Sequence, residues 1–412
     1  MMKRCEILSP AGDLEKLQFA VSYGADAVYM AMKSYGMRAS AGNFDMESLE
    51  KGLDFAHSKG ARVYCTLNTM PRDREFAGLE KMLGEFGGIC PDAFIVTDPG
   101  VISLVREKLP KAELHLSTQC STVNSRSCRF WYDNFGIKRI VLARELTLEE
   151  IKEIRQSIPE DMEIECFVHG AMCVSYSGRC LLSNYATGRD ANRGMCAQPC
   201  RWQYNMADVR DGLPLYSAEQ TEEGTYAFSS KDLCMVEHIP ELVEAGINSF
   251  KIEGRMKSAY YTAAVTNAYR MAYDTYVKDP KGFVTNPSWK KETESVSHRE
   301  YDTGFYFTPP HLSAQVCSAN VYLNDRAYLA TVSEYDEETG LAKCIQRNKF
   351  CVGDRVQLLS PSTCGRDVVI EKLYDEDMQE IESVPHAKQV FYIPVKDAKK
   401  WDIIRCGDTD AK

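Results

Sequence analysis

Five cysteines lie close together in the middle of the chain, within sequence rich in Gly and Arg; they are Cys173, Cys180, Cys196, Cys200 and Cys234. A thiolate is a soft ligand that suits an iron–sulfur cluster, zinc or Cu(I). The spacing lacks the paired Cys-x-x-Cys segments of many structural zinc sites, whereas wide and irregular spacing fits a cluster held by loops. The residues leave three interpretations open: a cluster, zinc, or no metal. Four ligands are needed from five thiols, so one of Cys196 and Cys200 can lie outside the coordination sphere.

Basic residues in and around this segment predict an anion site. Arg189 and Arg193 stand between the cysteines, and a guanidinium fork matches the oxygens of carboxylate or phosphate. The alternative for both is a surface ion pair with Asp190 or another acid. The other cationic candidates for substrate binding lie within or after predicted strand segments; they are Arg38, Arg144, Lys231, Lys251 and Arg255.

Two residues at strand ends can transfer protons. His169 ends the apolar run that begins at Ile164, and it can act as a general acid or base or orient a ligand by hydrogen bonding. The alternative is a histidine with purely structural hydrogen bonds. Glu253 follows a later predicted strand, where it can serve catalysis or pair with Arg255.

The elements that must position these residues alternate between short apolar strands and amphipathic helices. The predicted strands are Glu6–Leu8, Ala27–Met30, Arg62–Thr66, Ala93–Val96, Leu114–Leu116, Arg139–Leu142, Ile164–Val168 and Ser249–Ile252. Eight strands with intervening helices predict a (β/α)8 TIM-like barrel over residues 1–285. The cysteines then fall in an insertion after the seventh strand, about residues 171–234, above the active face. A doubly wound open sheet is the alternative, although no GxGxxG follows a strand.

The remainder of the chain has a different composition. Residues 286–311 are predicted as a linker, and residues 312–412, with short alternating strands and turn signals, as a small antiparallel β-barrel domain. The net charge of −10 argues against a surface coated with basic residues for bulk nucleic-acid binding, but not against a local basic groove. No secretory h-region or run of about 18 apolar residues is visible, so we expect a cytoplasmic protein without membrane association whose 16 cysteines are free thiols or ligands.

Long motifs resemble a known family. The segment E-C-F-V-H-G-A-M-C-V-S-Y-S-G-R-C-L-L-S, from Glu165 to Ser183, resembles the signature of peptidase family U32, the collagenase-like proteases. The similarity extends through I-L-S-P-A-G-D at the start, F-K-I-E-G-R-M-K-S near the eighth strand and S-H-R-E-Y-D-T-G-F-Y beyond it. Within that family the chain is similar to bacterial proteins that help to make 5-hydroxyuridine at the wobble position of tRNA.

The resemblance implies an iron–sulfur cluster, of the 4Fe–4S kind, and prephenate as the source of the hydroxyl group. Carried over by motif, the cluster ligands are Cys173, Cys180, Cys196 and Cys234, with Cys200 also matching a family cysteine. The implied partners are tRNA and prephenate, and pairs of homologues within the family make a homo- or hetero-oligomer conceivable. A uridine in an anticodon loop is single-stranded and can stack on an aromatic side chain such as Tyr176 or Tyr185.

Three rival functions remain open. A U32-type peptidase would use a Cys–His pair that includes His169, since neither HExxH nor G-x-S-x-G is present. The same thiols are the best ligands, however, and a ligated thiolate is a poor nucleophile. Relatives also predict hydroxylation of rRNA or of another substrate, and a non-catalytic scaffold that delivers tRNA to a partner is the third class.

Overall fold

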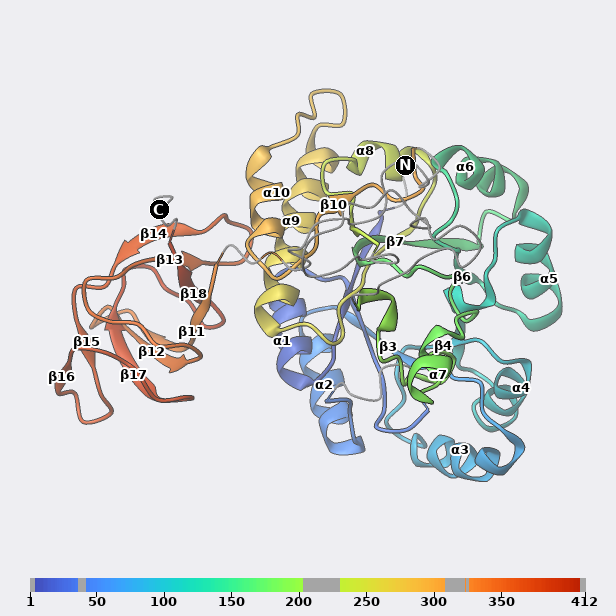
Figure 1. The fold of residues 1–412 in the computed structure, drawn as a ribbon, viewed down its shortest axis with the longest axis horizontal. Coiled ribbons are helices and arrows are strands. Elements are labelled where there is room, and N and C mark those ends of the chain that lie inside the picture. Colours follow the sequence, from blue (N-terminus) through green and yellow to red (C-terminus); the bar gives the residue numbers. More distant parts are fainter. Residues whose placement is uncertain (1–3, 36–41, 203–229, 308–322, 324–325, 408–412) are drawn as a thin grey trace, which may run out of the picture. The chain divides into compact units, whose positions relative to one another are not determined.

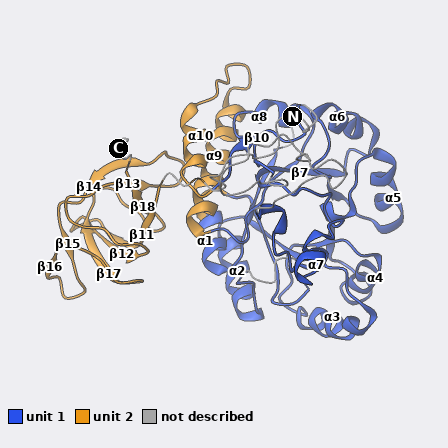
Figure 2. Ribbon diagram, in the orientation of Figure 1, with its two compact units in different colours: residues 1–21, 25–257, 298–322 blue, residues 22–24, 258–297, 323–412 orange. Residues whose placement is uncertain are grey.

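The computed structural model describes residues 4–35, 42–202, 230–307, 323 and 326–407 (Figure 1). The chain forms two compact units, each built from segments that are not contiguous in sequence (Figure 2). The first comprises residues 1–21, 25–257 and 298–322, and the second residues 22–24, 258–297 and 323–412. The residues predicted as a barrel to position 285 and a linker to position 311 are therefore shared between the two units.

Eight parallel strands of the first unit close into a barrel, which confirms the predicted fold class. They are β1 (Glu6–Pro10), β2 (Ala27–Met30), β3 (Arg62–Leu67), β4 (Ala93–Val96), β5 (Glu113–Leu116), β6 (Arg139–Val141), β7 (Glu163–Ala171) and β9 (Ser249–Ile252). Each pairs with its neighbour in chain order, and β9 closes the ring by pairing with both β1 and β7. Strands β2 and β4 are buried along their whole length, which is why they are continuous apolar runs in the sequence rather than alternating ones.

Helices follow most of the strands and surround the barrel (Figure 1). They are α1 (Leu14–Ser22), α2 (Met46–Ser58), α3 (Asp73–Glu85), α4 (Pro99–Lys108), α5 (Ser125–Phe135), α6 (Leu148–Ser157) and α8 (Ile239–Glu244). Their starts have local causes. Thr147, for example, accepts a hydrogen bond from the backbone of Glu150, whose carboxylate accepts one back from Thr147, and this capping box starts α6.

The strand starts are held together by buried charge. The Arg139 guanidinium, at the first residue of β6, lies 2.6 Å from a Glu6 oxygen and 2.7 Å from a Glu163 oxygen. All three stand at the first positions of their strands, so the amino-terminal end of the barrel is closed by an ion-pair cluster. In barrels of this type that end contributes stability, which leaves the other end for chemistry.

The insertion follows β7, as predicted. It contains α7 (Leu182–Thr187), the 3-10 helices η2 (Ala191–Arg193) and η3 (Pro199–Arg201), and the short strand β8 (Asp232–Cys234). Strand β8 runs antiparallel to the last residues of β7, and β10 (Tyr301–Asp302) pairs with β8 in parallel. Strand β7 is the longest barrel strand, and its last residues extend the sheet beyond the barrel. The thiol segment leaves the sheet after β7 and rejoins it at β8.

The second unit combines two helices with an antiparallel sheet. The helices are α9 (Ala259–Lys278) and α10 (Pro287–Glu294). The strands are β11 (Tyr328–Asp336), β12 (Leu341–Gln346), β13 (Arg355–Leu359), β14 (Arg366–Val369), β15 (Leu373–Tyr374), β16 (Glu380–Ile381), β17 (Val390–Pro394) and β18 (Ile403–Cys406). Their order in the sheet is β14-β13-β18-β11-β12-β17-β15-β16, around an apolar core that includes Val332, Phe391 and Ile404. Arg405 of β18 binds Glu292 of α10 through a buried ion pair of 2.6 Å.

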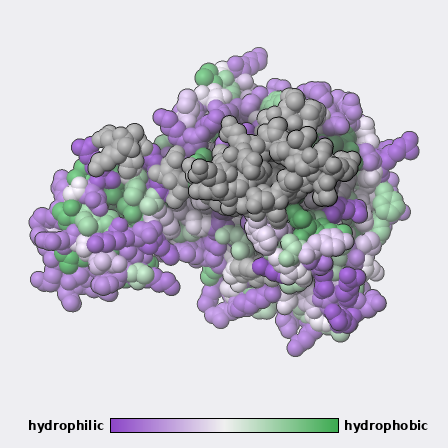
Figure 3. Space-filling model, viewed as in Figure 1, coloured by the Kyte–Doolittle hydropathy of each residue, from purple (hydrophilic) through white to green (hydrophobic). Residues whose placement is uncertain are grey.

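The described surface is mainly hydrophilic on the face shown in Figure 3, with hydrophobic residues scattered among polar ones. Among the helices of the described residues, none combines the length and the apolar character that crossing a bilayer demands.

Candidate functional site

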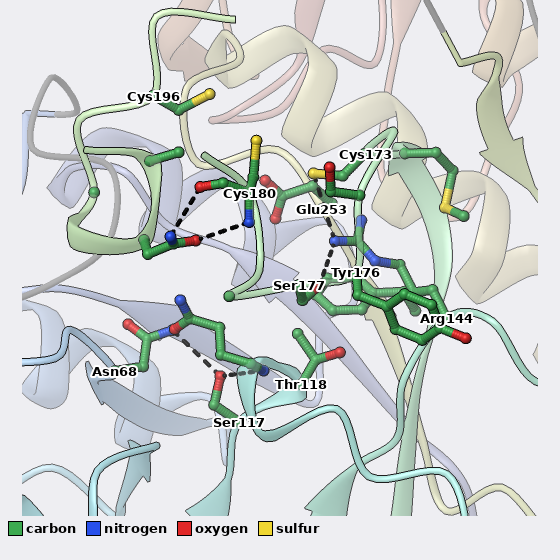
Figure 4. Close-up of a pocket in the computed structure, with 18 of the residues that line it drawn as sticks. Asn68, Ser117, Thr118, Arg144, Cys173, Tyr176, Ser177, Cys180, Cys196 and Glu253 are labelled. Carbon is green, nitrogen blue, oxygen red and sulfur yellow. Dashed lines mark hydrogen bonds between the residues drawn. The ribbon is translucent and has the colours of Figure 1, made fainter. Parts of the chain in front are cut away.

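A pocket opens at the end of the barrel where the strands finish (Figure 4). It encloses about 1380 Å³ of empty space, including space open to solvent. Its walls come from residues that end or follow β3, β5, β6 and β9, and from the cysteine insertion above them. The carboxyl ends of barrel strands form the usual catalytic face, so this pocket is the candidate site.

Four of the five candidate thiols line this pocket; they are Cys173, Cys180, Cys196 and Cys200. Figure 4 shows Cys173, Cys180 and Cys196 reaching into it from the insertion. Asn192 holds the backbone of Cys180 on both sides, because its amide oxygen accepts from the Cys180 N–H at 3.2 Å and its nitrogen donates to the Cys180 carbonyl at 2.8 Å. The insertion therefore presents its sulfur atoms from an ordered local frame.

Cys173 and Cys196 lie close enough to Cys200 to affect its pKa. Burial raises the pKa of Cys200; Arg201 opposes the rise, while Cys173 and Cys196 add to it. A bound cation would favour the thiolate form of Cys200 and offset this rise. In the described part of the chain, however, no three His, Cys, Asp or Glu side chains are already arranged as a metal site.

Cys234 is placed differently. It is half-buried at the end of β8, opposite His169 in the antiparallel ladder with β7, and does not appear among the described residues that line the pocket. His169 is fully buried, its Nε2 lies 3.4 Å from the Tyr301 hydroxyl, and burial lowers its pKa to about 3. A neutral imidazole in this position is suited to hydrogen bonding and cannot supply a proton near neutral pH.

Arg144, which follows β6, contacts the thiol segment from the barrel. Its guanidinium donates to the Ala171 carbonyl at 2.9 Å and to the Ser177 hydroxyl at 3.0 Å, and lies 3.9 Å from the Cys173 sulfur. These partners are neutral groups, and no carboxylate lies within ion-pair distance of Arg144 in the described ranges. Its positive charge is thus available to an anionic ligand in the pocket.

Two further predicted residues line the pocket beside Lys251. Lys251 lies 2.5 Å from the buried carboxylate of Glu165; burial alone would raise the pKa of Glu165, but Lys251 and Arg139 outweigh it and hold that pKa below its usual value. Glu253 accepts a hydrogen bond from the Tyr29 hydroxyl at 3.0 Å. Arg255 is buried and its guanidinium lies 3.4 Å from the Thr66 hydroxyl.

The remaining predicted cations lie elsewhere. Arg193 makes an ion pair of 2.5 Å with Glu75 of α3, which is the surface pairing that the sequence left open, although with a different acid from Asp190. Arg189 is exposed and donates to the Met195 carbonyl. Lys231 lines a smaller, adjoining pocket that shares Cys173 with the first, and it lies 3.5 Å from Glu300. Arg38 is outside the described residues.

Sequence reasoning missed the pair that connects the ends of the insertion. Asp232 of β8 and Arg299, just before β10, are both buried and lie 2.6 Å apart, and Arg299 also reaches the carbonyl of Met172 at 3.4 Å. Arg299 belongs to the S-H-R-E-Y-D-T-G-F-Y segment, which was noted only as a family motif. An Arg next to a His, in a family motif with three aromatic residues that lies far from the cysteines in sequence, was the available signal.

Comparisons with known proteins agree with this architecture. The family model for peptidase family U32 matches residues 12–315, and that for the U32 C-terminal domain matches residues 324–405. The tRNA hydroxylation protein P1 of Bacillus subtilis is 40% identical over 388 residues, covering 94% of this chain and 91% of that protein.

Two other relatives carry different names. The tRNA hydroxylation protein P of Escherichia coli is 37% identical over 399 residues, covering 87% of both chains. An uncharacterized protease of Methanocaldococcus jannaschii is 40% identical over 377 residues, covering 90% of both. With a barrel and a C-terminal sheet that both match their family models, this chain belongs to peptidase family U32.

Proposed function

We propose that this protein takes part in hydroxylating the wobble uridine of tRNA, with an iron–sulfur cluster on the pocket thiols and prephenate as the hydroxyl donor. The observation that carries the proposal is a single pocket at the barrel mouth that combines four thiols with the available charge of Arg144. Two relatives named for tRNA hydroxylation, each aligned over most of both chains, support the same class of substrate.

The donor set fits a cluster in its chemistry. Cys173, Cys180 and Cys196 would be ligands from the insertion, and the fourth would be Cys234 or Cys200. A bound cluster would supply one-electron redox chemistry beside the substrate. The Phe167 ring lies 4.8 Å from the Arg144 guanidinium, and the hydrogen bond from Arg144 to Ser177 holds the Cys173–Cys180 loop against the barrel.

The cations of the pocket suit a ligand with two carboxylates, as prephenate has. Arg144 offers a fork that makes no close ion pair in the described residues, whereas the charge of Lys251 is balanced by Glu165. Arg144 is therefore the principal anchor for a carboxylate, and Lys251 and Arg255 provide further donors at greater depth.

The pocket rim also offers aromatic surface for an unpaired base. Tyr176 lines the pocket and is 51% exposed, and Tyr185 of α7 is 84% exposed. An anticodon-loop base can leave its stack and lie against such a ring, which supports RNA as the substrate.

A peptidase is the weaker candidate. The described residues that line the pocket include no histidine, and the nearest motif histidine, His169, is buried with its Nε2 3.4 Å from the Tyr301 hydroxyl. A Cys–His nucleophile pair needs the two side chains within hydrogen-bond reach, so the described site gives the peptidase no specific support.

The deciding experiment compares modified nucleosides in bulk tRNA from cells with and without the gene, in a background that lacks other U32 proteins. We expect 5-hydroxyuridine-type modification to disappear and to return with the wild-type gene. Cys173→Ser should fail to restore it, whereas Cys90→Ser, an exposed cysteine outside the pocket, should succeed. An unchanged nucleoside profile on deletion would overturn the proposal.

A further inference from the structure

The pocket has two kinds of polar wall. Residues that follow β6 and β9 are charged: Arg144 and Arg255 are cationic, and Glu253 is a carboxylate beside them. Residues that end or follow β3 and β5 are neutral; they are Thr66, Asn68, Ser117, Thr118 and Gln119. Figure 4 shows Asn68, Ser117 and Thr118 together, with Arg144 apart from them. A ligand with both charged and neutral polar parts would find a different partner on each wall.

Gln119 has an unused donor on the neutral wall. It is 5% exposed, and its Nε2 has no hydrogen-bond partner in the part of the chain that the structure describes. Its Oε1 accepts from the Thr97 hydroxyl at 3.5 Å. Buried amide groups without a partner are rare because each loses its hydration without replacement. A ligand carbonyl that accepts from Nε2 would remove this cost.

The position of Gln119 is imposed by the backbone around it. The residue lies in the 3-10 helix η1 (Thr118–Cys120), where its N–H donates to the Ser117 hydroxyl at 3.3 Å. Gly178 of the thiol loop, with φ +75°, packs directly on it: a Cβ at Gly178 would stand 2.9 Å from the Gln119 carbonyl oxygen. The side chain is thus set between the barrel and the thiol loop.

We propose that Gln119 recognises the base by donating a hydrogen bond from its amide to a ring carbonyl of a pyrimidine that lies on the neutral wall. This inference rests on the proposed function and assigns the base and the carboxylates of the co-substrate to different walls. A neutral amide suits a base edge, whereas a carboxylate is drawn to the guanidinium and ammonium groups. Uracil has two ring carbonyls, and either of them can accept a hydrogen bond from the Gln119 amide. Cytosine has an amino group, which is a donor, in place of one of these carbonyls. Gln119 therefore favours uridine over cytidine.

The test measures binding by the purified full-length protein, without turnover. The probes are two RNA hairpins with an anticodon-type loop that differ only in uridine or cytidine at the wobble position, and prephenate is titrated separately. We expect the wild type to prefer the uridine hairpin. Gln119→Leu should weaken that hairpin by about tenfold, the effect of one hydrogen bond, reduce the preference, and leave prephenate affinity within about twofold.

Matched variants keep the outcome interpretable. Gln156→Leu makes the same change at an exposed position of α6 and should match the wild type. Gln119→Glu keeps the size of the side chain but replaces the donor with an acceptor, so binding of the uridine hairpin should weaken at least as much. This variant provides the test if Gln119→Leu does not fold. Equal binding of both hairpins by the wild type, or loss of prephenate rather than uridine binding in the Gln119 variants, overturns the inference. A Gln119-dependent uridine preference together with unaltered tRNA in deletion cells would reject the proposed function alone.

Discussion

The carboxylate of Asp232 and the guanidinium of Arg299 form a buried ion pair in which Arg299 donates from Nε at 2.9 Å and from Nη2 at 2.6 Å. The backbone N–H of Arg299 donates to the second carboxylate oxygen at 3.1 Å. Because Asp232 begins β8 and Arg299 also reaches the Met172 carbonyl, the pair ties together the two places where the thiol segment leaves and rejoins the sheet.

Breaking this pair should destabilise the protein strongly. Asp232→Asn leaves the Arg299 charge buried without its partner, and we expect a loss of about 3–5 kcal/mol in the free energy of unfolding, measured with denaturant. Iron bound per chain after anaerobic purification should fall as well, because β8 carries Cys234. Glu47→Gln breaks the exposed pair with Lys51 and should change neither quantity measurably. Equal effects of the two variants would show that the buried pair has no special role.

Arg144 should determine the affinity for the carboxylate ligand. Arg144→Gln removes the guanidinium charge, and we expect prephenate binding, measured by calorimetry, to weaken by at least about tenfold. Arg144→Lys keeps the charge without the fork and should restore only part of it. Arg189→Gln removes one charge from an exposed site and should bind as the wild type does. Normal binding by Arg144→Gln would remove Arg144 from the ligand site.

The iron content of single Cys→Ser variants should show which thiols are cluster ligands. Cys173→Ser, Cys180→Ser and Cys196→Ser are each expected to lose most bound iron and sulfide under anaerobic purification, because each removes a soft ligand from the pocket. Comparing Cys200→Ser with Cys234→Ser identifies the fourth ligand as the variant with the larger loss. Cys351→Ser, in the second unit, is the control. Colourless protein with stoichiometric zinc in the wild type would instead favour a zinc site.

Asp402 should make the second unit more stable in mild acid. The side chain is fully buried, and burial raises its pKa from 3.8 to about 6. A carboxyl with a raised folded-state pKa destabilises the fold where it is ionised, so its penalty is complete above pH 6 and disappears as the pH falls toward 4.

Asp402→Asn tests this dependence directly. We expect the variant to gain on the order of 2 kcal/mol over the wild type at pH 8, as judged from denaturant unfolding, and the gain to shrink toward pH 4. Asp377→Asn changes an exposed carboxylate, and its free energy of unfolding should depend on pH as that of the wild type does. A gain that is the same at both pH values would mean that Asp402 is not ionised at the higher one.

The barrel could be predicted from sequence because its elements are encoded locally. Strands covered on both faces are continuous apolar runs, and the glycines at helix ends, such as Gly246 with φ +80°, mark where the next strand begins. Cys173, Cys180, Cys196 and Cys200 lie within one short stretch of sequence, so their presence in one pocket needed only the position of β7.

Tertiary structure alone decided which residues of the same type meet. Nothing in the sequence distinguished Arg193, which pairs with Glu75, from Arg144, which keeps its charge available beside the thiols. The Asp232–Arg299 pair joins residues 67 positions apart, and Gly178 of the thiol loop packs on the backbone of Gln119, whose amide nitrogen has no partner in the described residues. Local propensity and hydrophobic pattern specify the elements, whereas the partner of a charged or polar group depends on which loops the closed sheet brings together.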